Sequence, residues 1–375
     1  MTTKPIGLYV HIPFCVSKCK YCDFCSLGAA YDRYIDDYVK ALCDEVKVYR
    51  REPGIAIDTL YFGGGTPSLL SPNMLEKILL GLRTVFDFNS LREFTLEANP
   101  GTLTYEKAIG FKALGVNRIS LGLQTVHENE LKLLGRIHTY EDFLSSYKML
   151  REAGFDNIGI DLMYGIPDQT RESFKETLSR VIALSPEHLS AYGLIIEEGT
   201  PFYLARNSLN LPVEDEECDM YDLACSMLAD AGYQHYEISN YSKAGYHSSH
   251  NLKYWRAEEY IGLGAAAYSY FDGERYGNPR SVERYLSGER KCDIERVDSG
   301  EEEIEYIMMN LRLSYGVSID DYQARFGKSF ISGREEILKR YIRGGYIVEH
   351  DGRISLTEQG FYISNSIISD LAYIN

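Results

Sequence analysis

Six short runs rich in β-branched and other apolar residues recur along the first half of the chain, and each is followed by a polar or glycine-rich turn and a segment of helical periodicity. Alternating strands and helices predict a parallel sheet, because parallel strands need a crossover between them. Six units are too few for a closed eight-stranded barrel, so we expect an α/β fold with a partial (βα)6 barrel; a doubly wound sheet is the alternative. The runs are residues 6–13, 57–64, 93–99, 118–124, 157–165 and 188–196.

The alternation ends near residue 200, and we interpret residues 1–200 as the partial barrel. Residues 201–297 contain longer, tyrosine-rich segments and acidic stretches, and we expect them to associate with the barrel. A charged stretch near residue 297, VDSGEEE, then leads into residues 298–375. There two amphipathic helices precede two short strands on either side of an Asp351-Gly352 turn. Helices followed by a hairpin predict a smaller, helical, winged-helix-like C-terminal domain.

The charge of the chain limits its partners. Lys and Arg number 39 and Asp and Glu number 55, which gives a net charge of −16 that would repel a nucleic-acid backbone. The first residues lack the basic start and apolar core of a signal peptide, and no apolar run approaches the ~18 residues of a membrane helix. We therefore expect a cytoplasmic protein that binds no nucleic acid. In that compartment thiols stay reduced, so clustered cysteines indicate metal binding.

Four of the eight cysteines lie together, directly after the first predicted strand. Cys15, Cys19 and Cys22 have the spacing C-x3-C-x2-C, which lets three thiolates from one loop converge on one inorganic cluster. A structural zinc site is the alternative, but such sites normally take four ligands from two separated C-x2-C pairs, and the sequence has no second pair. Cys25 is a candidate fourth ligand, and that alternative stays open here.

Glycines and polar residues occupy the ends of the other predicted strands. The second strand ends in YFGGGTPS, whose glycines let the backbone approach a ligand closely. Polar side chains among apolar neighbours are costly unless each has a partner, and three at corresponding strand ends favour a shared ligand over separate core hydrogen bonds. Arg136 is suited to a carboxylate, although a solvated helix end explains it too. The three polar residues are Glu97, Gln124 and Asp161.

The cysteine motif, with the aromatic Tyr21 before its last cysteine, resembles the signature of the radical S-adenosylmethionine superfamily. The resemblance implies a 4Fe-4S cluster on the three cysteines, with one iron open to the amino and carboxylate groups of S-adenosylmethionine. An electron passed through the cluster would then cleave the sulfonium carbon–sulfur bond and yield a 5′-deoxyadenosyl radical, while the protein orients the cofactor. The implied cofactor contacts are Tyr9, Tyr21, Gly64, Gly65, Thr66, Glu97, Gln124, Arg136 and Asp161.

Further motifs along nearly the whole chain are similar to those of the coproporphyrinogen dehydrogenase group, and most closely to its short HemW-type branch of heme chaperones. The oxygen-independent coproporphyrinogen III dehydrogenases have a longer N-terminal extension and a fourth cysteine two places after the third, where this chain has Phe24. The matching motifs are LYVHIPFC, CKYCDF, FGGGTPS, LEANPGT, SLGLQT, LGRIHT, DLMYGIPDQT and YEISNYSKAGYHSSHNLKYW.

The last motif contains the stretch HNxxYW, which resembles a signature of the chaperone branch that has been linked to heme binding. His250 is the candidate heme contact, because neutral imidazole is a good iron ligand and the rings of Tyr254 and Trp255 could cover a porphyrin face. His247 is a second candidate. The alternative is a structural cluster of hydrogen bonds and packed rings.

The resemblance implies a protein that binds a 4Fe-4S cluster, S-adenosylmethionine and heme, and that passes heme to an acceptor protein. An electron donor is a further implied partner, and both proteins are unidentified; a membrane protein that binds transiently is one expected class of acceptor. The enzymatic alternative is an oxygen-independent coproporphyrinogen III oxidase, which decarboxylates porphyrinogen propionates by a radical reaction. A zinc-stabilised binding module is a third class.

Overall fold

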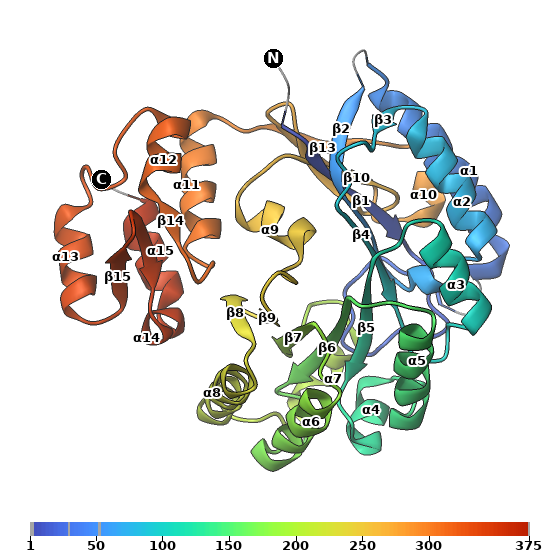
Figure 1. Ribbon diagram of the computed structural model, residues 1–375, viewed down its shortest axis with the longest axis horizontal. Coiled ribbons are helices and arrows are strands. Elements are labelled where there is room, and N and C mark those ends of the chain that lie inside the picture. The colour runs from blue at the N-terminus through green and yellow to red at the C-terminus, as the bar shows by residue number, and fades with distance from the viewer. Residues whose placement is uncertain (1–3, 29–30, 52–53, 374–375) are drawn as a thin grey trace.

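The computed structural model describes residues 4–28, 31–51 and 54–373, and its larger part is a curved sheet covered by helices (Figure 1). Six strands lie side by side and parallel in the order β1-β2-β4-β5-β6-β7. They coincide with the six predicted runs, so the α/β fold with a parallel sheet is confirmed. The strands are β1 Ile6–Ile12, β2 Ile55–Gly64, β4 Glu93–Ala98, β5 Arg118–Gln124, β6 Ile158–Tyr164 and β7 His188–Gly193.

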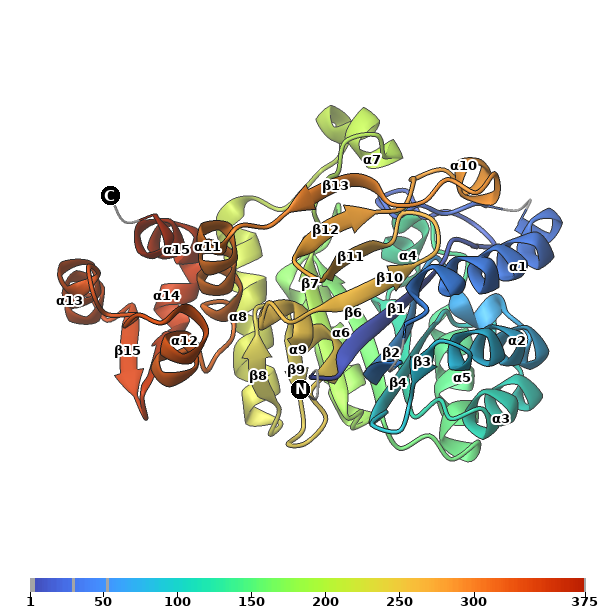
Figure 2. The same ribbon diagram turned by 90° about the horizontal axis from the view of Figure 1, so that it is seen from above.

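Helices between the parallel strands cover the outer face of the sheet (Figure 2). Hydroxyl side chains define where several of them begin: the Ser71 hydroxyl accepts a hydrogen bond from the Met74 amide, and Thr139 and Thr170 each form a capping box. The helices are α1 Ile35–Val46, α2 Pro72–Arg83, α3 Tyr105–Ala113, α4 Glu128–Leu134, α5 Tyr140–Glu152 and α6 Arg171–Ala183.

The sheet continues past both ends of the parallel block, which the sequence did not predict. Beyond β1 lie β10, β11, β12 and β13, of which β10 is parallel to β1, and beyond β7 lie β9 and β8. These strands are five residues long at most, too short for a clear pattern. They are β8 Gln234–Glu237, β9 Asn240–Ser242, β10 Tyr260–Leu263, β11 Tyr268–Phe271, β12 Glu274–Gly277 and β13 Cys292–Arg296; β3 (Phe86–Asp87) pairs with β2.

A smaller C-terminal unit has its own hydrophobic core, which includes Ile307, Leu338 and Ile354 (orange and red in Figure 1). Its hairpin turns at Asp351-Gly352 as predicted, and a third strand pairs with β16. The unit comprises α11 Ser299–Asn310, β14 Val317–Ser318, α12 Ile319–Phe326, α13 Glu335–Arg343, β15 Ile347–His350, β16 Arg353–Leu356, α14 Glu358–Tyr362 and α15 Ser364–Ala372. The three domain boundaries stay predictions.

Four more helices lie between β7 and the C-terminal unit: α7 Pro201–Ala205, α8 Glu214–Asp230, α9 Ser249–Trp255 and α10 Val282–Leu286. Helix α9 carries the HNxxYW motif and contacts both β2 and α11, so it lies between the sheet and the C-terminal unit (Figure 1). Across the residues that the structure describes, no helix combines the length and the apolar character needed to cross a membrane.

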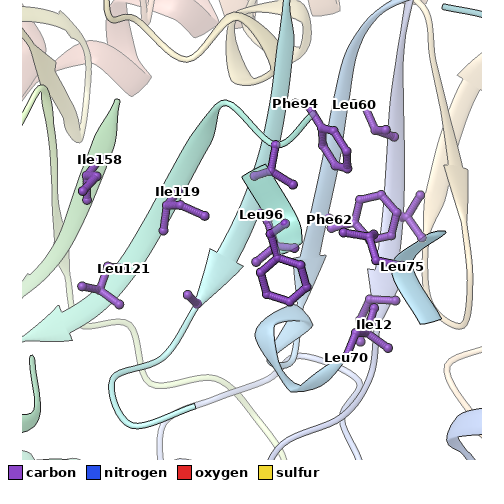
Figure 3. Packing of buried hydrophobic residues seen from close by; sticks show 14 of the residues in the cluster. Ile12, Leu60, Phe62, Leu70, Leu75, Phe94, Leu96, Ile119, Leu121 and Ile158 are labelled. Atoms are coloured by element: carbon purple, nitrogen blue, oxygen red, sulfur yellow. The ribbon is translucent and has the colours of Figure 1, made fainter. Parts of the chain in front are cut away.

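The main core lies between the sheet and the outer helices, where side chains of neighbouring strands pack together (Figure 3). Phe62, Leu96 and Leu121 are fully buried there. Burial of each such side chain stabilises the fold by about 1.5–3 kcal/mol, which keeps the strands in register. Because side chains alternate along a strand, the residues between these positions project from the opposite, concave face of the sheet.

Candidate cofactor site

The concave face carries several of the residues that the sequence singled out. Tyr9 on β1 is paired in register with Tyr61 on β2, and their ring centroids are 6.0 Å apart. Glu97 on β4 and Asp161 on β6 lie on the same face, with Glu97 in register, through Ser120 on β5, with the residue two places before Asp161. The parallel sheet therefore places residues from distant segments on one surface, next to the loop that follows β1.

The loop after β1 gathers the three predicted cluster cysteines. The Cys15 amide donates to the Leu27 carbonyl at 2.9 Å, which holds the start of the loop against its end. The three cysteines are half-buried. Burial raises the pKa of Cys22 to about 11, and the neighbouring Cys19 and Cys15 thiols raise it as well. The thiols are thus close enough to influence one another's ionisation.

The thiols are not arranged around one point. Within the described ranges, no three His, Cys, Asp or Glu side chains have the geometry to hold a single metal ion. A cluster in which each thiolate binds a different iron needs a wider spacing than one ion does. Cys25 is engaged elsewhere, since its thiol donates to the carbonyl oxygen of Arg280 at 2.9 Å.

Two glycines at the end of β2 hold the strand against the cysteine loop. The Gly65 amide donates to the Ile12 carbonyl at 2.9 Å, and a Cβ on Gly65 would lie 2.7 Å from the Phe14 carbonyl oxygen. Gly64 has φ +106°, and a Cβ there would overlap the ring of His11. Both positions therefore exclude a side chain, for packing reasons that the sequence alone did not reveal.

Glu97 lies beside this glycine turn. Its carboxylate accepts hydrogen bonds from the Tyr61 hydroxyl at 2.7 Å and from the Gly64 amide at 3.0 Å. Burial raises the pKa of Glu97 to about 7, because desolvation outweighs these two hydrogen bonds. Burial likewise raises the pKa of Asp161, which accepts from the Ser120 hydroxyl at 3.0 Å. Two carboxyl groups that resist ionisation thus share the concave face.

A chain of polar contacts connects the helix-end arginine with two cysteines. Arg136 Nη2 donates to Asn99 Oδ1 at 2.7 Å, and its Nη1 lies 3.7 Å from Cys19 Sγ. Asn99 Nδ2 donates to Thr66 Oγ1 at 2.8 Å, and Thr66 Oγ1 lies 3.6 Å from Cys15 Sγ. A small cavity adjoins this chain of contacts. The sequence analysis missed Asn99, although it directly follows β4 in the LEANPGT motif.

Gln124 Oε1 and Arg136 Nε are buried polar atoms near the loop that have no hydrogen-bond partner in the described part of the chain. Gln124 also has φ +71°, a conformation that is uncommon for a residue other than glycine. Buried polar atoms are nearly always hydrogen bonded, so these two are open to a bound polar group. Three thiols next to such atoms fit a cluster together with a polar cofactor.

The two predicted tyrosine contacts have different surroundings. The Tyr9 hydroxyl donates to His11 Nδ1 at 3.0 Å, and His11 Nε2 donates to the Cys25 carbonyl at 2.8 Å. That carbonyl can only accept, so it selects the tautomer of His11. His11 thereby links the concave face to the cysteine loop, a role that the sequence analysis missed. Tyr21 packs in a separate apolar cluster with Leu134 and neighbouring side chains.

His250 lies inside the protein rather than on an open surface. Its Nδ1 is 2.9 Å from Thr59 Oγ1 and its Nε2 is 2.8 Å from the Tyr254 hydroxyl, while its ring stacks on Tyr61 at 5.1 Å. The Glu93 carboxylate accepts from the His250 amide at 3.1 Å. Burial lowers the pKa of His250 to about 3. Iron coordination by His250 would therefore require a ring hydrogen bond to break.

Comparisons with known proteins agree with the fold. The family model described as the radical SAM superfamily matches residues 9–181, and the model described as the HemN C-terminal domain matches residues 301–363. The whole chain superposes on coproporphyrinogen III oxidase (HemN) from Escherichia coli with a TM-score of 0.84, covering 98% of this chain and 90% of that one. At 23% identity, this likeness concerns the fold alone.

Curated relatives match over almost the full length. The heme chaperone HemW of Lactococcus lactis is 38% identical over 98% of this chain and 97% of its own length. The proteins of the same name from Bacillus subtilis and Escherichia coli are each 36% identical, and each match covers 97% of the relative. Similarity of this extent defines a family.

Proposed function

From the premise that this chain belongs to the HemW family of radical S-adenosylmethionine proteins, we propose that it is a heme chaperone, which binds heme and transfers it to an acceptor protein. The full-length similarity to three curated heme chaperones carries the proposal. Phe24 two places after Cys22 also favours it over the oxidase alternative. The proposal includes an electron donor and an acceptor protein, and a membrane protein is one proposed class of acceptor.

In this proposal Cys15, Cys19 and Cys22 hold a 4Fe-4S cluster, which when bound can pass an electron to S-adenosylmethionine. Arg136 is already fixed by Asn99, and its guanidinium group would orient the carboxylate of the cofactor. The turn at Gly64, Gly65 and Thr66 would bind the amino group together with Glu97. Further proposed contacts are Tyr9, Tyr21, Gln124 and Asp161, and His250 is the proposed heme contact.

The assignment of Glu97 predicts a pH-dependent affinity for S-adenosylmethionine. Because burial raises the pKa of Glu97 to about 7, the carboxyl group is mostly neutral at pH 6 and mostly ionised at pH 8. An amino group that binds iron is neutral, and its N–H groups donate more strongly to the ionised carboxylate than to the neutral carboxyl group, so the affinity should rise with pH, by up to about tenfold over this interval. Titration of the reconstituted protein with S-adenosylmethionine at both pH values measures this change. Glu97→Gln should remove it, and an equal rise in that variant would contradict the assignment.

Heme binding and porphyrinogen turnover distinguish the two candidate functions. Anaerobically reconstituted protein is titrated with heme, and a separate sample receives coproporphyrinogen III, S-adenosylmethionine and a reductant. We expect a shifted Soret band in the first sample and no decarboxylation in the second. Formation of protoporphyrinogen would overturn the chaperone proposal and support the oxidase, whereas colourless protein that contains zinc would indicate the zinc-stabilised module.

A further inference from the structure

A cavity of about 500 Å³ lies where β6 and β7 end, between these strands, α8 and the C-terminal unit. In Figure 1 α14 of that unit lies next to α8, and the Tyr362 hydroxyl of α14 donates to the Asp222 carboxylate of α8. Both parts of the protein therefore contribute to the wall of the cavity. It lies at the carboxyl edge of the parallel strands, where ligands of such folds bind.

Aromatic rings form much of the wall of this cavity. Tyr192 and Tyr362 are 39% and 46% exposed, so a ligand can reach their rings from outside. The ring centroids of Tyr362 and Tyr221 are 5.9 Å apart at an angle of 80°, an edge-to-face contact that holds both rings in place. The faces of such rings attract cations. The aromatic residues of the wall are Tyr164, Tyr192, Tyr221, Phe361 and Tyr362.

Two carboxylates of α8 line the same cavity. Glu214 and Glu217 lie three residues apart in the first turn of the helix, and so on one face of it. In the described part of the chain, neither side chain forms a hydrogen bond or an ion pair. Burial raises the pKa of Glu217, and the charge of Glu214 raises it further. Acidic residues also stabilise the first turn of a helix, so these carboxylates alone do not define a site.

A buried amide lies beside the cavity, directly after the lining residue Ser239. Asn240 is 4% exposed, and within the described residues its Oδ1 accepts no hydrogen bond, while its Nδ2 donates to Glu237. Asn240 is in register with Ser190 on β7, so its side chain lies on the face of the sheet that carries Tyr192, two places after Ser190. Since buried acceptors are nearly always hydrogen bonded, this oxygen indicates a donor that the described residues do not supply.

We propose that this cavity binds an arginine side chain of a protein partner, which stacks on the tyrosine rings and pairs with Glu214 and Glu217. A guanidinium group is a planar cation with five N–H donors, and it combines stacking on aromatic rings with bidentate binding of carboxylates. The cavity exceeds the volume of one side chain, so adjoining residues of the partner fit beside it. With a net charge of −16, the chain attracts basic partners at long range. The inference goes beyond the proposed function, since it requires neither heme nor the cluster.

A fluorescent synthetic peptide with one arginine among uncharged residues tests the site in the wild-type protein at physiological ionic strength. A second peptide carries citrulline in place of the arginine, which has nearly the same shape but no charge. Because hydrogen bonds between charged groups are the stronger ones, we expect the arginine peptide to bind at least about tenfold more tightly. A lysine peptide should bind more weakly than the arginine peptide, because an ammonium group cannot bind a carboxylate bidentately. Fluorescence anisotropy measures the three affinities.

Three variants locate the binding. Glu214→Gln combined with Glu217→Gln should lower the affinity for the arginine peptide to that for the citrulline peptide. Asp36→Asn combined with Asp37→Asn is the matched control, because it removes the same charge from exposed positions in the first turn of the outer helix α1. Tyr192→Leu keeps the bulk of the side chain but removes the ring, and it should weaken binding of the arginine peptide about two- to fivefold.

Circular dichroism melting of every variant checks folding. Equal wild-type affinity for the arginine peptide and either of the other two peptides would overturn the site, as would undiminished binding of the arginine peptide by the folded glutamate variant. If that variant unfolds, Tyr192→Leu decides, and undiminished binding by it would overturn the site. The proposed heme contact lies outside this cavity, so the heme titration tests the chaperone function separately.

Discussion

Cys15→Ala, Cys19→Ala and Cys22→Ala should each abolish the brown chromophore of the anaerobically reconstituted protein and lower its iron content to a small fraction of the wild-type value. Each thiolate is proposed to bind a different iron, so the loss of one leaves a corner of the cluster without a protein ligand. The thiol of Cys25 donates to the Arg280 carbonyl, so we do not expect it to replace the missing ligand. Visible absorption and iron per chain measure the effect.

Cys25→Ala and Cys218→Ala are the controls for these three variants. Both remove a half-buried cysteine, and we expect both to keep the wild-type absorption and iron content. Loss of the chromophore in Cys25→Ala would instead favour a fourth cysteine ligand. A chromophore that survives in all three motif variants would rule out the assigned ligands.

Gly65→Ala should both destabilise the protein and reduce the yield of cluster on reconstitution. The new methyl group would lie 2.7 Å from the Phe14 carbonyl oxygen and 2.8 Å from the Ile12 carbonyl oxygen, so backbone must move. Overpacking of this kind costs about 1–3 kcal/mol, and here the displaced backbone leads directly into the cysteine loop. The melting temperature and the iron bound after reconstitution measure the two effects.

Gly28→Ala is the matched control, because Gly28 lies close to the other end of the cysteine loop and, among the described residues other than Gly28 and its chain neighbours, none has a heavy atom within 4 Å of a Cβ placed there. It should melt and bind iron as the wild type does. If Gly65→Ala did the same, the backbone contact between β2 and the loop would not position the cysteines, and the role of the glycine turn would have to lie with the cofactor alone.

The parallel sheet could be predicted because its strands are buried on both faces and read as nearly continuous apolar runs. The cysteine motif could be predicted because its three thiols come from one loop. Strands β8 to β13 could not, since each is short, and β10 and β9 join the sheet through β1 and β7, which lie far from them along the chain. The C-terminal hairpin was predicted only in part. Its turn is local and was predicted, but its pairing with β14 was not.

Side-chain partners were harder to predict than the elements that carry them. His250 is hydrogen bonded to Thr59, which is 191 positions away, and only the folded chain brings them together. Asn99 was missed because its contacts with Thr66 and Arg136 join three separate loops. The glycines at the end of β2 were expected to make room for a ligand. In the structure, other parts of the protein also pack directly against them.

Electron paramagnetic resonance of the reduced protein, recorded with and without S-adenosylmethionine, tests the central claim most directly. That claim is a cluster held by three thiolates, with one iron left for the cofactor. We expect a signal from the reduced cluster that changes shape and position when S-adenosylmethionine is added in excess. A cluster signal that is identical in both samples would contradict the account.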